Sequence, residues 1–283
     1  MKRLPIITIL LLITLAPMLV SAKNTDVTEK VNMNGATKAV ITCDFNVGEF
    51  YIKPADISEL AIADISYNDR RVEYTVDSEK KGDRCLLDMG TEYVRKHDMD
   101  TEDNIWDIQL STRYPMTIDL DIGACEADFD LGGIPITELT MDVGAASGMI
   151  EFSEPNPERM EELSIDAGAS SIEMRDIGNA NFDEFNFDGG AGSFELDFRG
   201  TYNGESTIEI SVGLGSADII LPKGVPVQID KGGDNWMSSV DLHNRSLDEV
   251  EDGIYESDDF ENAKTRIVLI IEVGMGSVDV YWK

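Results

Sequence analysis

The sequence predicts an all-β protein, a β-helix-like β-solenoid with coils of about 22 residues and capping strands at both ends. Three observations predict it. An Asp-x-Gly-Ala motif recurs at nearly constant spacing, apolar residues alternate on both sides of the motif, and long helical periodicity is absent. Alternation with a period of two is typical of β-strands. A unit this short cannot bury its apolar side alone, so we expect neighbouring units to stack.

The repeat consists of segments that align without a gap. They are Ile118-Asp-Leu-Asp-Ile-Gly-Ala124, Leu139-Thr-Met-Asp-Val-Gly-Ala145, Leu163-Ser-Ile-Asp-Ala-Gly-Ala169, Phe185-Asn-Phe-Asp-Gly-Gly-Ala191 and Ile208-Glu-Ile-Ser-Val-Gly-Leu214. From Gly123 to Gly213 the motif glycines are separated by 21, 24, 22 and 23 residues. Ile270-Ile-Glu-Val-Gly-Met275 is a further copy, and Cys43-Asp-Phe-Asn-Val-Gly48 is a weaker one. We expect each glycine at a bend where a side chain would clash or φ is positive.

The regular coils occupy residues 116–222 of a single domain that spans residues 39–283. Atypical strands are expected in residues 39–115 and in residues 223–283, where they cap the stack. Residues 23–38 are polar and are expected to form a disordered linker, and residues 248–259 an acidic surface loop. The segment Pro157-Glu-Arg-Met-Glu-Glu162 predicts a helical turn in the longest step of the repeat.

The N-terminus has the pattern of a signal peptide over residues 1–22. Lys2 and Arg3 precede an apolar run that ends at Val20, and Ser21 and Ala22 provide a small-residue cleavage site. An uncleaved anchor is the alternative, because about 17 to 20 apolar residues can just cross a bilayer. No later segment is apolar enough to span. We therefore expect an extracytoplasmic protein that is secreted, periplasmic or on the cell surface.

The chain is strongly acidic, with 55 acidic and 23 basic residues and a net charge of −32. Such a surface repels nucleic acid and anionic lipid. It attracts cations, basic peptides and basic protein faces, or it serves only to keep the protein soluble. The three cysteines, Cys43, Cys85 and Cys125, allow one disulfide and one spare thiol, although a buried thiol at each position is the simpler interpretation.

Several segments carry a resemblance to a known family. The Asp-x-Gly-Ala turns, with Asn104-Ile-Trp-Asp-Ile-Gln-Leu110, Gly178-Asn-Ala180, Leu196-Asp-Phe198 and Leu221-Pro-Lys-Gly224, resemble the toast-rack family of exported bacterial proteins over residues 40–283. Residues 213–229 and Val273-Gly-Met-Gly-Ser-Val-Asp-Val280 are similar to the C-terminal domain of LiaF-like cell-wall-stress proteins. Those proteins have a membrane-spanning N-terminal half, where this chain has a leader. The resemblance implies a fold and an envelope location, and it names no reaction.

The candidate site is a row of four aspartates, Asp121, Asp142, Asp166 and Asp188, each two residues before its motif glycine. Stacked coils would place them about 4.8 Å apart. Each neighbouring pair would then repel by about 1 kcal/mol in water and by about 3 kcal/mol at an effective dielectric near 20. Shared protons, bridging calcium ions, or backbone N–H donors at the bend could relieve this repulsion. The four aspartates are therefore candidate calcium ligands, and no other cofactor is predicted.

No catalytic residue is predicted. His97 and His243 are the only histidines, and neither lies near a nucleophile motif. We expect a non-enzymatic, exported scaffold or recognition protein of the cell envelope, linked by resemblance to the cell-wall stress response, with an envelope protein or a glycan as partner. The alternatives are an adhesin-like surface binder and a glycan-cleaving β-helix enzyme that uses paired aspartates. Residues 116–222 hold 23 acidic and three basic residues, which argues against an anionic polymer as substrate.

Overall fold

The computed structural model describes residues 24–93, 104–232, 237–243 and 246–283. These residues form one sheet of 17 strands and contain two short 3₁₀ helices but no α-helix. The all-β prediction is therefore confirmed. The predicted signal peptide, residues 1–22, lies outside the described residues. The described part of the chain contains no helix with the length and hydropathy needed to cross a membrane.

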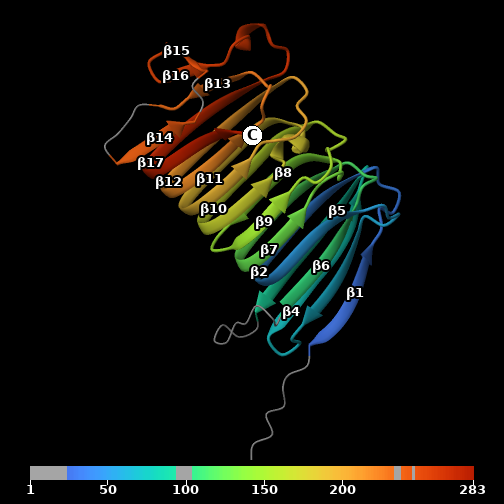
Figure 1. Ribbon diagram of the computed structural model, residues 1–283. Coiled ribbons are helices and arrows are strands. Elements are labelled where there is room, and N and C mark those ends of the chain that lie inside the picture. Colours follow the sequence, from blue (N-terminus) through green and yellow to red (C-terminus); the bar gives the residue numbers. More distant parts are fainter. Residues whose placement is uncertain (1–23, 94–103, 233–236, 244–245) are drawn as a thin grey trace, which may run out of the picture.

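Most of the sheet is a parallel stack of long strands (Figure 1). Its members are β2 (Lys38–Ala55), β7 (Met116–Asp130), β8 (Ile136–Val143) with β9 (Ser147–Glu151), β10 (Met160–Arg175), β11 (Phe182–Asp197), β12 (Glu205–Leu221) and β17 (Arg266–Trp282). The register follows the sequence repeat, because Leu163 pairs with Phe185, Phe185 with Ile208, and Ile208 with Leu269. Equivalent residues of successive repeats therefore lie side by side.

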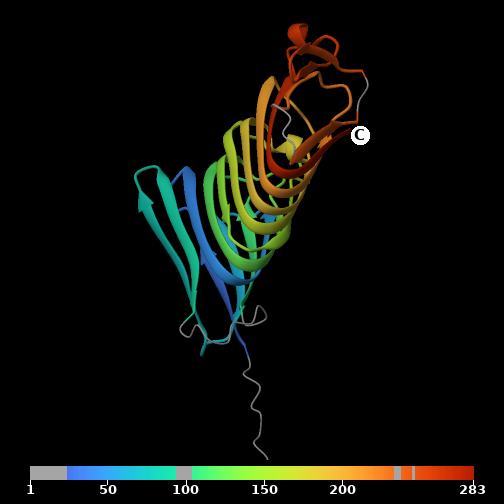
Figure 2. The same ribbon diagram turned by 90° about the vertical axis from the view of Figure 1, so that its left-hand side faces the viewer.

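Each long strand bends near its motif glycine, so the stack has two arms, and Figure 2 shows the bent strands as stacked arcs. We call the part before the bend the first arm and the part after it the second arm. The inner sides of the arms face each other, because the rings of Phe187 and Phe194 lie 5.0 Å apart and those of Phe185 and Phe198 also lie 5.0 Å apart. The apolar core lies between the arms.

The motif glycines are needed at the bend because the coils approach each other closely there. A Cβ on Gly168 would lie 2.6 Å from the backbone oxygen of Gly144, and one on Gly190 would lie 2.8 Å from that of Gly168. A clash, rather than a positive φ, therefore selects glycine at these positions. The second glycine of the last two coils does have a positive φ, +140° at Gly215 and +144° at Gly276.

The N-terminal end of the stack is closed by shorter strands. They are β1 (Thr25–Val31), β3 (Ala61–Tyr67), β4 (Val72–Lys81), β5 (Arg84–Tyr93) and β6 (Asn104–Ser111). Strands β5 and β6 pair in parallel with the first and second arms of β2, and β4 extends the sheet antiparallel to β5. On the second arm, β3 pairs antiparallel with β6 and β1 pairs antiparallel with β3.

The C-terminal end is closed in a similar way by β13 (Val227–Asp230), β14 (Ser238–Leu242), β15 (Asp248–Glu251) and β16 (Ile254–Glu256). Strand β13 pairs with the first arm of β17, and β14 pairs with its second arm. Strand β16 then pairs antiparallel with both β13 and β15. The 3₁₀ helices are η2 (Ile177–Ala180) and η3 (Phe260–Asn262).

Asparagines in the connecting loops join neighbouring coils. Buried Asn156 donates from Nδ2 to the backbone oxygens of Ile136 at 2.7 Å and Ala180 at 3.1 Å, and its Oδ1 accepts from the N–H groups of Ile136 and Glu158. One side chain thus satisfies backbone groups of three successive repeats. Buried polar groups need such partners, so this loop is fixed by its hydrogen bonds.

Three expectations about local structure are wrong. Residues 23–38 are not a disordered linker, because β1 pairs with β3 from Thr25 to Val31. The alternation of Thr25–Val31 fits a strand, but its pairing partner lies more than 30 residues away in the sequence. Residues 157–162 form no helical turn, since β10 already begins at Met160. Residues 248–259 are not simply a loop, because they include β15 and β16.

Candidate functional site

The four predicted aspartates lie side by side on the first arm. Asp121 pairs with Asp142, Asp142 with Asp166, and Asp166 with Asp188. The row is longer than the sequence analysis indicated, because Asp44 pairs with Asp121 at one end, and Ser211 and Glu272 continue it at the other. We call the row from Asp44 to Glu272 the aspartate ladder.

Strand alternation places the ladder on the outer face of the first arm. In β10, the side chains of Ile165 and Ala167 are buried on either side of exposed Asp166. The equivalent positions Asp121 and Asp142 are exposed between buried neighbours in β7 and β8. The carboxylates therefore face solvent, and water can screen their mutual repulsion.

Asp121 shows the electrostatic consequence of this arrangement. Partial burial raises the pKa of its carboxyl above the usual value, and the negative charges of Asp44 and Asp142 raise it further. Within the described part of the chain, no hydrogen bond reaches the carboxylates of Asp121, Asp142, Asp166 or Asp188, whereas Asp44 accepts one from Asn46 Nδ2 at 3.2 Å. Donors at the bend therefore do not relieve the repulsion between these four groups.

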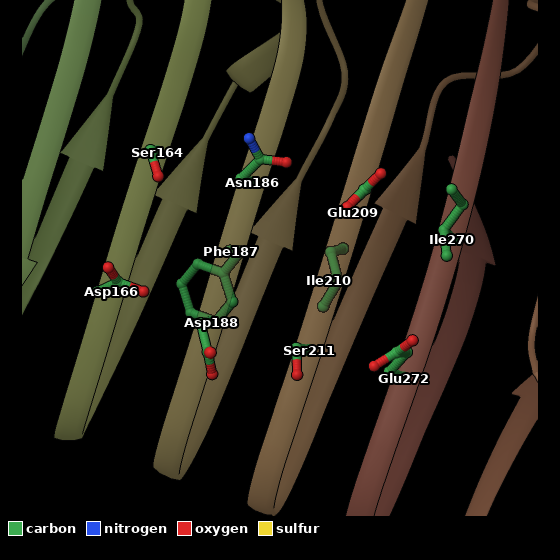
Figure 3. A pocket seen from close by; sticks show the side chains of 10 residues that line it. All are labelled: Ser164, Asp166, Asn186, Phe187, Asp188, Glu209, Ile210, Ser211, Ile270 and Glu272. Atoms are coloured by element: carbon green, nitrogen blue, oxygen red, sulfur yellow. The ribbon is translucent and has the colours of Figure 1, made fainter.

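A surface groove of about 270 Å³ lies over the C-terminal half of the ladder. Figure 3 shows Asp166, Asp188, Ser211 and Glu272 following one another across four neighbouring strands. A second row along the groove contains Ser164, Asn186, Glu209 and Ile270. The groove therefore offers carboxylates, hydroxyl groups and one amide, and none of the side chains that line it is basic.

The same chemistry extends over the outer face of the first arm. From β7 to β17 its outward positions in the three rows nearest the bend are Thr117, Asp119, Asp121, Glu138, Thr140, Asp142, Glu162, Ser164, Asp166, Glu184, Asn186, Asp188, Thr207, Glu209, Ser211, Val268, Ile270 and Glu272. More than half of these residues are acidic and none is Lys or Arg. This first-arm acidic face has the charge to bind a positively charged partner.

The second arm carries two further rows that the sequence analysis did not identify. A serine row runs from Ser147 through Ser171, Ser193, Ser216 and Ser277 to Ser239, and an acidic row runs through Glu173, Glu195, Asp218, Asp279 and Asp241. The sequence feature that could have predicted these rows is a Ser three positions after the motif glycine, followed in several repeats by an acidic residue five positions after it. This face is less uniform in charge, because Arg175 and Lys53 form ion pairs with Glu173 and Asp107.

Among the described residues, the titratable side chains away from the ladder show no arrangement typical of catalysis. His243 contacts Asp279 through Nε2 at 2.6 Å, and its ring stacks on Tyr281 at 4.5 Å. His97 lies outside the described residues. Cys43, Cys85 and Cys125 are free, buried thiols, and burial raises the pKa of Cys125 to about 12. These thiols are therefore protonated near neutral pH and are poor nucleophiles.

The described residues contain no group of three or more His, Cys, Asp or Glu side chains placed to hold a metal ion. The ladder offers each carboxylate one neighbour on either side along a single row. Calcium normally takes six to eight oxygen ligands. Calcium bridging by Asp121, Asp142, Asp166 and Asp188 therefore stays a prediction for experiment.

Two family models cover this stack of strands. The model of the N-terminal domain of toast-rack matches residues 20–175, which is more than half of the chain. The chain belongs to the toast-rack family. A second model, cell wall-active antibiotics response LiaF, C-terminal, matches residues 171–280. The two matches overlap within β10, so the toast-rack sheet continues from one to the other. Neither description names an enzymatic activity.

Solved structures similar to this toast-rack chain have low sequence identity. A candidate cell-adhesion protein from Clostridium sporogenes is 19% identical, with a TM-score of 0.48, and covers 92% of this chain and 100% of its own. A candidate adhesin from Bacteroides fragilis is 11% identical, with coverages of 92% and 98% and a TM-score of 0.39. A candidate lipid-binding protein from Parabacteroides distasonis is 10% identical, with coverages of 92% and 97% and a TM-score of 0.38. The comparison with curated proteins gives no match.

Proposed function

We propose that this toast-rack protein is a non-enzymatic, exported recognition scaffold of the cell envelope, and that its first-arm acidic face binds a basic surface of a partner protein. The observation that carries the proposal is the first-arm acidic face, whose three rows align carboxylates from β7 to β17 without a Lys or Arg among them. Arg266, one outward position further from the bend, is paired with Glu205. The match to the LiaF C-terminal model supports a role in the response to cell-wall stress.

The architecture supports a scaffold role. In this proposal the parallel stack is an open β-solenoid with coils of about 22 residues, and stacked repeats form rigid, extended binding surfaces. The core between the arms, with Phe187 against Phe194 and Phe185 against Phe198, keeps the outer face in a fixed shape. A partner therefore meets rows of charge whose spacing is set by the strand separation of about 4.8 Å.

A pair of charge-matched variants tests the proposal. The first-arm variant carries Asp166→Asn, Asp188→Asn and Glu272→Gln, and the second-arm control carries Glu126→Gln, Asp128→Asn and Glu195→Gln, at exposed positions outside any ion pair in the described part of the chain. Both remove three negative charges, so they change the net charge of the protein equally. Only the position of the lost charges differs between them.

The probe is a Lys-rich peptide, and its dissociation constant is measured by calorimetry at several salt concentrations. Each exposed ion pair contributes about 0.5 kcal/mol, so the first-arm variant should bind about tenfold more weakly than the unmodified protein. The second-arm control should change affinity less than threefold. Equal losses in both variants, or no salt-dependent binding by the unmodified protein, would show that the first-arm face is not the recognition surface.

A further inference from the structure

An apolar patch lies at the bend near the C-terminal end of the stack. Five large apolar side chains are exposed in the described part of the chain, and three of them adjoin: Leu214 at 51%, Met275 at 44% and Met237 at 43% exposure. Leu214 pairs in register with Met275, and the N–H of Gly276 donates to the backbone oxygen of Met237 at 3.1 Å. We call these three residues the apex patch.

The apex patch departs from the pattern of the earlier coils. The residues equivalent to Leu214 in β7, β10 and β11 are Ala124, Ala169 and Ala191, all of which are small. The sheet therefore folds with Ala at this position, and a large side chain is not required by the bend. Single exposed apolar residues are ordinary on protein surfaces, but three adjacent ones on an otherwise acidic stack indicate an interaction site.

Acidic residues border the apex patch on both arms. Glu272 precedes Met275 by three residues on the first arm, and Asp218 follows Leu214 by four residues on the second arm. On the second arm Asp218, Asp279 and Asp241 lie in register. No Lys or Arg lies between Glu272 and Asp279. A partner that covers the patch therefore meets negative charge on both sides.

We propose that the apex patch is the docking site for a cationic amphipathic peptide segment. The apolar side chains of the segment pack on Leu214, Met275 and Met237, and its Lys or Arg side chains reach Glu272 on one side and Asp218 on the other. Methionine side chains are flexible and adapt to different apolar partners. The proposal rests on the acidic recognition face proposed above, and it adds an apolar anchor to it.

Charge complementarity favours a peptide over the other possible occupants. An anionic membrane would be repelled by Glu272, Asp218 and Asp279, as would nucleic acid. A second copy of this chain would bring a second acidic surface to the same place. A cationic segment with one apolar face can pack on the apex patch and also pair with the acidic residues that border it.

The test compares two peptides of identical composition and charge. One has Leu and Lys at helical spacing, so that its apolar residues share one face, and the other has the same residues in scrambled order. The protein variant is Leu214→Ala with Met275→Ala, which restores the residue found in the earlier coils. Val250→Ser, at a residue that is 50% exposed in β15, is the matched control. Thermal unfolding confirms that each variant is folded.

We expect the amphipathic peptide to bind the unmodified protein at least tenfold more tightly than the scrambled peptide. The Leu214→Ala/Met275→Ala variant should lose this difference, and Val250→Ser should keep it. Equal binding of both peptides to the unmodified protein would overturn the proposal that the apex patch is a docking site. It would leave the proposal for the acidic recognition face unaffected. If neither peptide binds, both proposals fail. Binding to zwitterionic vesicles that is lost in the double Ala variant would assign the patch to lipid instead.

Discussion

Replacing one carboxylate in the middle of the aspartate ladder should stabilise the protein. Asp142 lies between Asp121 and Asp166 in the parallel register. At a separation of about 4.8 Å each pair repels by about 1 kcal/mol in water. Screening at 0.15 M salt, where the Debye length is about 8 Å, reduces this to about 0.5 kcal/mol per pair. Asp142→Asn removes both repulsions, so we expect a gain of about 1 kcal/mol at this salt concentration.

Thermal unfolding measures this gain. For a domain of this size, about 1 kcal/mol corresponds to a rise of about 2–4 °C in the unfolding midpoint. The rise should be larger at low salt and should nearly vanish at 1 M, where the Debye length is about 3 Å. Glu154→Gln, in an exposed loop outside the strands, removes the same charge and should change the midpoint little. A lower midpoint for Asp142→Asn in the presence of chelator would refute the reasoning, because it would mean that the carboxylate accepts a stabilising interaction.

Further predictions concern pH, the loops, the bends and calcium. Because the pKa of Asp121 is raised in the folded state, the folded state binds this proton more tightly than the unfolded state does. The stability that protonated Asp121 contributes is fully present below pH 3.8 and is lost as the pH rises through the folded pKa. Asp142→Asn should weaken this loss in unfolding measured between pH 4 and 7, and an unchanged profile would contradict the coupling. Asn156→Ala should lower the unfolding free energy by about 3 kcal/mol, because it leaves buried backbone groups unpaired. Asn156→Asp should not recover the loss, because a carboxylate cannot donate to the backbone oxygens of Ile136 and Ala180. A loss below about 1 kcal/mol for Asn156→Ala would contradict the bridging role. Gly168→Ala should lower the unfolding free energy by about 1–3 kcal/mol through overpacking. Gly90→Ala should lower it less, because the nearest atom to the added Cβ would be 3.3 Å away. The reverse order of the two losses would contradict the steric explanation for glycine at the bend. If calcium bridges the ladder, millimolar calcium should raise the unfolding midpoint more than NaCl of equal ionic strength, and an equal rise with NaCl would contradict calcium bridging.

The repeat made much of the stack predictable from the sequence. Gly123, Gly144, Gly168 and Gly190 recur at steps close to 22 residues, and the aspartates keep a fixed distance from them. A constant step places the same residue of successive repeats side by side, so the four central members of the ladder could be named in advance. The alternation on both sides of the glycine also showed which side chains face the core.

The ends of the stack were harder to predict because their pairing does not follow the repeat. Strand β1 pairs with β3 across an interval of more than 30 residues, and its alternating polar residues gave no copy of the motif. Asp44 and Glu272 belong to the ladder because β2 and β17 pair with the regular coils, although their local sequences lack the full Asp-x-Gly-Ala motif. Such contacts depend on loop closure between distant segments, which short-range periodicity does not encode.

The sequence by itself determined the all-β class, the step of the stack, the strong negative charge and the positions of Asp121, Asp142, Asp166 and Asp188. The tertiary structure alone decided that the carboxylates share three outer rows nearest the bend without Lys or Arg among them, and that Leu214, Met275 and Met237 meet at the bend. The reason is geometric. The sequence repeat shows which residues of successive repeats are equivalent. The bend between the two arms and the closing strands determine which of these equivalent residues lie together on the surface of the protein.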